Sequence, residues 1–527
     1  MNGLSVLVTA LSVLVAAGQA TYQNPVIPGD YPDPSVIRVG QDYYATATTS
    51  EWAPLFPILH SRDLVNWTNI GSVFQKRPGW SVGNYWAPEI AHFGGTYFIY
   101  YVARKQNGPL SVAVATASQP EGPYTDHGPM VSQAAGSIDP VPIEDENGQR
   151  YLIWKEDGNS RNLPTPLWIQ ALSPDGTKLI GEMKEIMRND TPWEGRVVEG
   201  PFVIRTRGYF YLFYAGNACC GRNCHYGGGV ARAKNLLGPW EKNPNNPIIT
   251  ENELWKCPGH GSLVQHPDGD FYFMYHAYHA ENFVYVGRQA VLDKVEFTEN
   301  GWPTINQGRG TAYESAAPYA SAAAHREYSF EDEFVTAQLK PEWQWPQNNE
   351  PVYTISNIYH GSLVLRPNAT HAGDPAGGVL AIKTTSGAYD AETVLRRDHW
   401  VPGSVAGLSA FGDQENALGL SIDGEHLQLW RRAQKKHEII VTQDLPIGDR
   451  LFIKLTARDG HKMTFAISPD GQNWKQVAPE TPLEGDYLPP WDRGIRVALT
   501  VGGTNTAAAT FELLQIHSKP PQLRPPR

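Results

Sequence analysis

The chain has 527 residues, which is more than one hydrophobic core usually holds, so two domains are expected. Charged residues make up 18% and aromatic residues 11% of the sequence, a balance that excludes a disordered chain and favours a β-rich globular protein. The formal net charge of −11 repels phosphate backbones and argues against nucleic acid as a partner.

Residues 1–20 are typical of a signal peptide. Leu4 to Ala17 form an almost unbroken apolar run that is too short to span a membrane. The small residues Gly18 and Ala20 make cleavage before Thr21 plausible, and no other segment is a membrane-span candidate. We therefore expect a secreted, extracellular protein without a membrane partner.

Two further features agree with secretion. Sequons for N-glycosylation occur at Asn66, Asn189 and Asn368. Four cysteines can form two disulfides in an oxidising compartment, and the sequence leaves all three pairings open. The alternative is a zinc site that uses three of the cysteines and His225, although the spacing is not a standard one. The cysteines are Cys219, Cys220, Cys224 and Cys257.

A Gly-x-x-Tyr pattern, followed by a short apolar or aromatic run, occurs five times before residue 300. The steps between the tyrosines are 54, 54, 60 and 61 residues. Each run is typical of a buried strand. Five repeats of this size, each with about four strand-sized segments, predict a five-bladed β-propeller over residues 21–310, whereas a β-sandwich would not explain the even spacing. The tyrosines are Tyr43, Tyr97, Tyr151, Tyr211 and Tyr272.

The second half of the chain has a different pattern. Residues 311–327 are small and turn-prone, which predicts a linker. Short alternating strands separated by Asp-Gly turns resume from residue 328, which predicts a β-sandwich of the jelly-roll or concanavalin type over 328–518. A proline-rich disordered tail is expected over 519–527. The predicted fold class is therefore all-β, a propeller followed by a sandwich.

Each repeat also carries a polar residue beside Pro or Gly, eight to twelve residues before its tyrosine. Only the innermost strand of a blade lines the propeller axis, so residues at one phase of the repeat should converge on one axial pocket. Carboxylates that converge repel one another, which separates their pKa values and can leave one ionised base beside one protonated acid. The alternative is that these are ordinary turn motifs. The residues are Asp33, Glu89, Asp139, Glu199 and His260.

At these residues the sequence resembles glycoside hydrolase family 43. The segment from Gln23 to Ser35 looks like the opening of that family. The resemblance spans roughly residues 22–310 and implies a five-bladed propeller, in agreement with the repeat count. Four further motifs follow in the family's order, namely Trp86-Ala-Pro-Glu89, Ser137-Ile-Asp-Pro140, Glu199-Gly-Pro201 and Gly259-His-Gly261.

The resemblance implies roles for three carboxylates. Asp33 would be the general base that activates a water, and Glu199 the general acid that protonates the glycosidic oxygen. Asp139 would hold Glu199 in place and raise its pKa by like-charge repulsion. A base and an acid with room for a water between them imply single displacement with inversion at the anomeric carbon.

The resemblance also implies binding residues around the pocket. Arg288 would contact sugar hydroxyls and steady a carboxylate, although a surface salt bridge is its alternative. Trp86 and Glu89 would line the pocket, and Trp52 resembles the aromatic platform of exo-acting β-xylosidases. His260 matches a residue that binds a central calcium or a water in relatives; because calcium prefers oxygen ligands, such a calcium would be held through water, and no cofactor is required.

These features predict a secreted exo-glycosidase that acts on plant hemicellulose such as arabinoxylan or xylo-oligosaccharides. It would release terminal β-D-xylose, α-L-arabinofuranose or both, since the two sugars present similar hydroxyl patterns. The alternatives are an endo-arabinanase, a non-catalytic carbohydrate-binding propeller, and a lectin that binds sugar through its sandwich. The sugar preference, the attacked linkage and the oligomeric state stay open.

Overall fold

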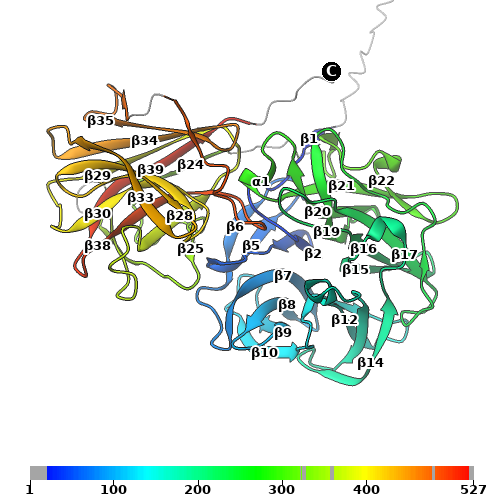
Figure 1. The fold of residues 1–527 in the computed structure, drawn as a ribbon. Helices are drawn as coiled ribbons and strands as arrows, with labels where there is room; N and C mark the ends of the chain where they lie inside the picture. The colour runs from blue at the N-terminus through cyan, green and yellow to red at the C-terminus, as the bar shows by residue number, and fades with distance from the viewer. Residues whose placement is uncertain (1–19, 321, 323–327, 357–360, 478–480, 521–527) are drawn as a thin grey trace, which may run out of the picture.

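The computed structural model describes residues 20–320, 322, 328–356, 361–477 and 481–520 (Figure 1). The predicted signal peptide and tail lie almost entirely outside these residues. The regular secondary structure of the described residues is nearly all strand, and no helix among them is long and apolar enough to cross a membrane. Its helical segments are α1 (Phe283–Val286) and the 3-10 turns η1 (Gly158–Arg161), η2 (Pro192–Glu194) and η3 (Asn306–Gly308).

Each sequence repeat folds into one antiparallel sheet of four strands, and the Gly-x-x-Tyr motif forms the turn into the second strand of each sheet. The all-β propeller prediction is confirmed. In chain order the sheets are β2 (Ser35–Val39), β3 (Asp42–Thr46), β5 (Leu55–Ser61) and β6 (Thr68–Phe74); β7 (Ser81–Phe93), β8 (Thr96–Lys105), β9 (Leu110–Ala117) and β10 (Thr125–Val131); β11 (Ser137–Glu144), β12 (Arg150–Glu156), β13 (Leu167–Leu172) and β14 (Leu179–Met187); β15 (Val198–Thr206), β16 (Tyr209–Gly216), β17 (Gly227–Ala233) and β18 (Glu241–Lys242); β19 (Trp255–Gln265), β20 (Phe271–His279), β21 (Gln289–Phe297) and β22 (Pro303–Ile305).

The first strand of each sheet contacts the first strand of the next, and the ring β2, β7, β11, β15, β19 closes back on β2. The closure is tied by β1 (Thr21–Gln23), which pairs with β23 (Glu314–Ala316). The Tyr22 hydroxyl donates to the Leu292 carbonyl of the fifth sheet at 2.6 Å. Part of the predicted linker is thus a strand that closes the ring, because its backbone completes a ladder with the chain start.

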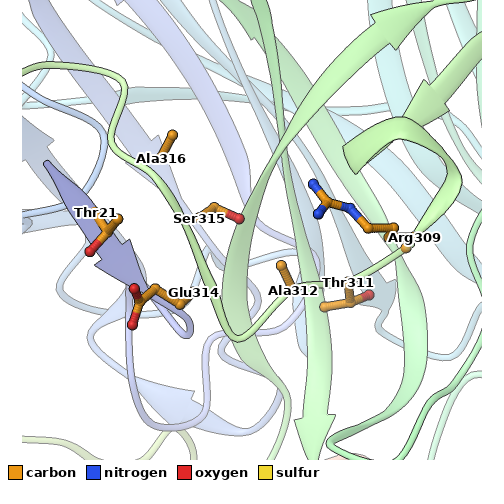
Figure 2. Close-up of a pocket in the computed structure, with 8 residues that line it drawn as sticks. Thr21, Arg309, Thr311, Ala312, Glu314, Ser315 and Ala316 are labelled. Carbon is orange, nitrogen blue, oxygen red and sulfur yellow. The ribbon is translucent and has the colours of Figure 1, made fainter. Parts of the chain in front are cut away.

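A pocket of about 470 Å³ lies at this closure (Figure 2). Its lining comes from Thr21 on β1 and from the segment between Arg309 and Ala316. It includes none of the carboxylates that the repeat phase singles out, so it belongs to the seam of the ring and not to the predicted site.

Four of the five innermost strands have an irregularity near their starts. The register shifts between Ile138 and Val141 on β11 and between Glu199 and Phe202 on β15, with similar shifts on β7 and β19. Such bulges bend a strand and redirect its side chains. Positive φ angles occur at the same places, which non-glycine residues adopt only where the surrounding structure enforces them. They are Asp33 (51°), Ala87 (41°), Asp139 (56°), Gly200 (54°) and His260 (42°).

The second half of the chain forms two antiparallel sheets, which agrees with the predicted sandwich. One has the order β26 (Val352–Ser356), β27 (Ser362–Arg366), β39 (Ala509–Ser518), β29 (Tyr389–Arg396), β34 (Arg450–Arg458), β35 (Lys462–Ser468) and β36 (Lys475–Gln476), with β24 (Ser329–Asp332) on β39 and β37 (Leu483–Glu484) on β35. The other has the order β28 (Gly378–Lys383), β38 (Arg496–Gly503), β30 (Ser404–Phe411), β31 (Ala417–Ile422), β32 (His426–Ala433) and β33 (Lys436–Asp444).

The two domains lie side by side (Figure 1) and are joined by a pair of short strands and by an ion pair. Strand β4 (Trp52–Ala53) of the propeller pairs with β25 (Trp345–Pro346) of the sandwich. Arg496 donates to Asp30 Oδ2 at 3.1 Å across the interface, and both side chains are buried. Removing one partner of a buried ion pair is strongly destabilising, because the other charge stays buried and unpaired.

Replacing Arg496 with Met should lower the free energy of unfolding by about 3–5 kcal/mol, because Asp30 would remain buried without its ion-pair partner. Denaturant unfolding followed by tryptophan fluorescence measures the loss. Lys435→Met, which breaks an exposed pair with Glu415 in the same domain, is the matched control and should cost less than about 1 kcal/mol. Equal losses in the two variants would contradict the role assigned to the interface pair.

Candidate active site

The structure brings the three predicted carboxylates together at the starts of three innermost strands. Asp33 precedes β2, Asp139 lies on β11 and Glu199 on β15, and their exposed fractions are 7%, 6% and 9%. His260 joins two of them, since its Nδ1 lies 3.5 Å from Asp33 Oδ1 and 4.0 Å from Asp139 Oδ2. The backbone N–H of Gly200 on β15 donates to Asp139 Oδ2 at 2.9 Å, which connects β15 to β11.

Asp33 is surrounded by donors and cationic groups. Arg288 Nη1 donates to Asp33 Oδ1 at 2.8 Å, and Thr48 Oγ1 donates to Asp33 Oδ2 at 2.7 Å. His276 Nδ1 lies 3.1 Å from Asp33 Oδ1. Arg288 thus reaches the pocket as expected, and its alternative as a surface salt bridge is wrong because only 4% of the residue is exposed.

These neighbours determine the charge of Asp33. Burial raises the pKa of this carboxyl, but Arg288, followed by His260 and His276, outweighs burial and holds the pKa well below its usual range. Burial, together with the charge of Arg288, lowers the pKa of His276 to about 4, so that ring is neutral at pH 7. Asp33 is therefore a carboxylate at every ordinary pH.

Glu199 is held by two donors, one on each oxygen. Lys155 Nζ donates to Glu199 Oε2 at 2.6 Å, and the Tyr226 hydroxyl donates to Oε1 at 2.9 Å. Burial raises the pKa of Glu199, but the Lys155 ammonium group outweighs burial and lowers it overall. Both contacts favour the ionised carboxyl.

Asp139 carries the raised pKa of the pair. Burial lifts its pKa to about 6, His260 opposes the rise, and the negative charge of Glu199 adds to it. The expectation is that Asp139 raises the pKa of Glu199. The net pKa of Glu199 is nevertheless lowered, because the Lys155 ammonium group sits against this carboxyl and outweighs the factors that raise its pKa; the modulating role of Asp139 stays a prediction.

Sequence reasoning missed several of these side chains, although the repeat carries a signal for two of them. Lys155 and His276 both stand four residues after the tyrosine of their repeat. In the hairpin of the first two strands, this position lies across from the residue just before the predicted site residue. Ile138, before Asp139, pairs with Lys155, and Gly259, before His260, pairs with His276. Extending the phase argument to the second strand would have found both. Thr48 and Tyr226 have no such signal.

A loop of the sandwich reaches this end of the propeller. Trp491 meets Trp86 edge to face at 6.0 Å between ring centroids, and 59% of Trp491 is exposed. The neighbouring Asp492 accepts a hydrogen bond from the Ser50 hydroxyl at 2.8 Å. Trp86 packs on Ala87, whose N–H donates to the same Thr48 hydroxyl that contacts Asp33. Trp86 therefore borders the site as expected, and Trp491 adds a wall from the second domain.

One predicted binding residue, Trp52, lies elsewhere, and the pocket role of Glu89 stays a prediction. Trp52 is not a platform in the pocket: it is 2% exposed and packs on Phe411 and Arg496 of the sandwich. Its strand pairs with the second domain, so its ring fills the interface. Glu89 contacts Ser35 on the adjacent strand β2, and burial raises its pKa to about 8, which leaves it neutral at pH 7.

All four cysteines form disulfides, Cys219 with Cys220 and Cys224 with Cys257, which rules out the zinc alternative. Among the described residues, no group of three or more His, Cys, Asp and Glu side chains is placed to hold a metal ion. The predicted calcium, held through water at His260, stays a prediction. The sequon residues are half-buried, and each amide nitrogen donates a hydrogen bond within the protein, so their glycosylation also stays a prediction; they are Asn66, Asn189 and Asn368.

The bridge between Cys224 and Cys257 ties the segment that carries Tyr226 to the start of β19. Replacing both cysteines with Ser should lower the free energy of unfolding by about 2–4 kcal/mol, because the unfolded chain regains the freedom of a long closed loop. Thermal and denaturant unfolding measure the loss. Peptide mapping without reduction should recover Cys224 linked to Cys257, and a link between Cys220 and Cys257 would contradict the pairing.

Comparison with known proteins identifies the families that the two domains match. Residues 22–303 match the family described as glycosyl hydrolases family 43, and residues 331–515 match the β-xylosidase C-terminal concanavalin A-like domain. The chain is 25% identical over 492 residues to xylosidase/arabinosidase 43B of Humicola insolens, covering 87% of this chain and 88% of the relative. It is 30% identical over 521 residues to a putative β-xylosidase of Escherichia coli K12, covering 88% and 93%.

Among solved structures, the GH43 protein BlXynB of Bacillus licheniformis superposes with a TM-score of 0.80 at 25% identity, covering 95% of this chain and all of that one. The first family match alone covers more than half of the chain, and the second covers the sandwich. This protein therefore belongs to glycosyl hydrolase family 43 and is a glycosidase with a concanavalin-like C-terminal domain.

Proposed function

We propose that the protein is a secreted, inverting exo-glycosidase of plant hemicellulose that releases terminal β-D-xylose, α-L-arabinofuranose or both. One observation carries the proposal: three buried carboxylates from three blades meet around His260, one of them permanently ionised and the other two sharing an environment that retains a proton. Relatives named as xylosidases and arabinosidases support the sugar class.

In this mechanism Asp33 is the base. Arg288 and Thr48 hold its carboxylate in one orientation, so that it can accept a proton from the attacking water. Arg288 keeps this group ionised at the cost of lower basicity. As the water oxygen bonds to the anomeric carbon, the glycosidic bond breaks and its electron pair passes to the leaving oxygen.

Glu199 is the acid that protonates this leaving oxygen, and Asp139 is its electrostatic partner. The two carboxyls interact strongly enough that their titration belongs to the pair and not to either residue. The pair holds one proton below pH about 6, where the last proton is lost. Lys155 and Tyr226 stabilise the carboxylate that remains after Glu199 has given its proton away.

The shape of this end of the propeller supports the proposal of exo action. The sandwich loop that carries Trp491 and Asp492 contacts the first blade at Ser50 and the second blade at Trp86. Just after this loop, the Ile495 N–H donates to the Tyr285 carbonyl at 2.7 Å. A groove of about 620 Å³ runs between the second and third sheets and is lined by Asp157, which contacts Lys155 on the side of the acid. The rest of the substrate would leave the pocket along this groove.

The first test compares wild type with Asp33→Asn and Glu199→Gln on the 4-nitrophenyl β-xyloside and α-L-arabinofuranoside. Asp33→Asn should lose about 10²–10⁴-fold in kcat/KM, because it removes the base, and Glu199→Gln should lose less on these substrates, because 4-nitrophenol leaves with little help from an acid. Proton NMR of the first product should show the inverted anomer. Unchanged rates would remove the catalytic roles, absence of all activity in wild type would favour the carbohydrate-binding alternative, and a retained anomer would contradict single displacement.

The second test is the pH dependence. The rate should fall as pH rises through about 6, since the Asp139–Glu199 pair then loses its last proton, while the ionisation of Asp33 should impose no limit near neutrality. Measuring kcat/KM between pH 4 and pH 9 checks this. A profile that stays flat to pH 8 would contradict the assignment of the proton to this pair.

The third test concerns the wall from the sandwich. Trp491→Ala should raise KM about tenfold with a smaller change in kcat, since it removes contact area beside the pocket and no proton-transfer group. Trp474→Ala, which alters a half-buried tryptophan of the same domain that stacks on Lys454, is the control and should leave KM unchanged. Equal KM values in both variants would show that Trp491 does not contact substrate.

A further inference from the structure

Lys155 is a buried cation placed directly on the proposed acid. Only 1% of its side chain is exposed, and its ammonium group contacts two carboxylates, Glu199 Oε2 at 2.6 Å and Asp157 Oδ1 at 3.1 Å. It comes from the end of β12, the second strand of the third blade, while Glu199 belongs to the fourth blade. A buried ammonium group requires a carboxylate partner, but a single carboxylate outside the site would meet that requirement.

The contacts on Glu199 select one of its charge states. Lys155 and Tyr226 each donate to a different oxygen of this carboxyl, and a carboxylate accepts both bonds while a protonated carboxyl loses one of them. Burial raises the pKa of Tyr226 well above its usual value, so its hydroxyl remains a donor. The cradle therefore fits Glu199 after it has passed its proton on, better than before.

We propose that Lys155 is a positioning residue that sets the strength of Glu199 as an acid, and that Asp157 limits this effect by sharing the ammonium group. This rests on the proposed role of Glu199 as the proton donor. When the O–H bond of Glu199 breaks and its proton bonds to the leaving oxygen, negative charge appears on the oxygen that faces Lys155. The stabilisation thus grows along the reaction and assists bond breaking.

The other charged groups at this position have separate effects. Asp139 faces the Lys155–Glu199 pair from β11, and its repulsion opposes ionisation of Glu199. His260 faces both acids from β19 and favours their ionised forms. Lys155 acts on Glu199 and Asp139 in the same direction, so any change in Lys155 moves the titration of the whole pair one way.

The rival explanation is that Lys155 only neutralises two buried acids and stabilises the fold. The two accounts differ in the direction of two changes. Removing the ammonium group with Lys155→Met should weaken Glu199 as an acid, whereas Asp157→Asn should leave Lys155 wholly to Glu199 and strengthen it. A structural lysine predicts lower stability in both variants and no displacement of the pH profile in opposite directions.

The experiment measures kcat against pH for the glycoside that wild type cleaves best, with 4-nitrophenol and with methanol as leaving groups. In Lys155→Met the alkaline limb should move up by about one pH unit or more, and in Asp157→Asn it should move down. The loss of kcat in Lys155→Met should be greater for methanol, because the poorer leaving group depends more on the acid.

Lys242→Met is the matched control. Lys242 pairs with the fully buried Glu194 at 2.7 Å in the fourth blade and contacts none of the catalytic carboxylates. This variant should lose stability and keep the alkaline limb of wild type. If Lys155→Met does not fold, Lys155→Arg and Asp157→Asn replace it: the arginine variant should retain the limb of wild type, and the asparagine variant should still move it down.

The inference is overturned if the alkaline limb stays in place in both variants, or if both move it in the same direction. Its failure differs from that of the proposed function. If Glu199→Gln keeps its activity with methanol as the leaving group, the role of Glu199 falls and the inference falls with it. If Glu199→Gln is inactive and the limb does not respond to Lys155 and Asp157, only the inference falls.

Discussion

Three acidic side chains share one buried space at the end of the propeller axis, and two buried cations make that arrangement stable. Arg288 compensates Asp33, and Lys155 compensates Glu199. Among the described residues no Lys or Arg forms an ion pair with Asp139, which retains a proton to a higher pH than an exposed carboxyl would. The site therefore obtains an ionised group and a proton-holding pair from the placement of charges, with no metal ion taking part in the steps proposed.

The ring of innermost strands keeps these charges in place. Each blade contributes one short segment at which a backbone φ angle turns positive, as at Asp33, Asp139 and His260, and in four of the five blades the innermost strand also bulges there. Conformations of this kind cost about 1–3 kcal/mol each, and a closed ring of packed sheets supplies the surrounding structure that maintains them. The same geometry that strains the backbone directs the side chains to a common point.

The sandwich completes the site while stabilising the propeller. Its strand β25 extends β4, and its Arg496 neutralises Asp30 near the start of the chain. Through the same interface it delivers Trp491 to the edge of Trp86. An open propeller face suits the interior of a polymer, whereas a face closed on one side suits a chain end, so a domain without catalytic groups can determine the mode of attack.

From the sequence alone one could determine the fold class, the repeat and the carboxylates Asp33, Asp139 and Glu199, because a residue's phase in a radial repeat fixes its distance from the axis. The tertiary structure decided what lies beside them. Trp52 follows the pocket motif yet faces the sandwich, since a local motif does not reveal which domain covers it. The pKa of Asp139 is raised and that of Glu199 is lowered because Lys155, from a neighbouring blade, adjoins Glu199, and electrostatic energies depend on distance in space and not along the chain.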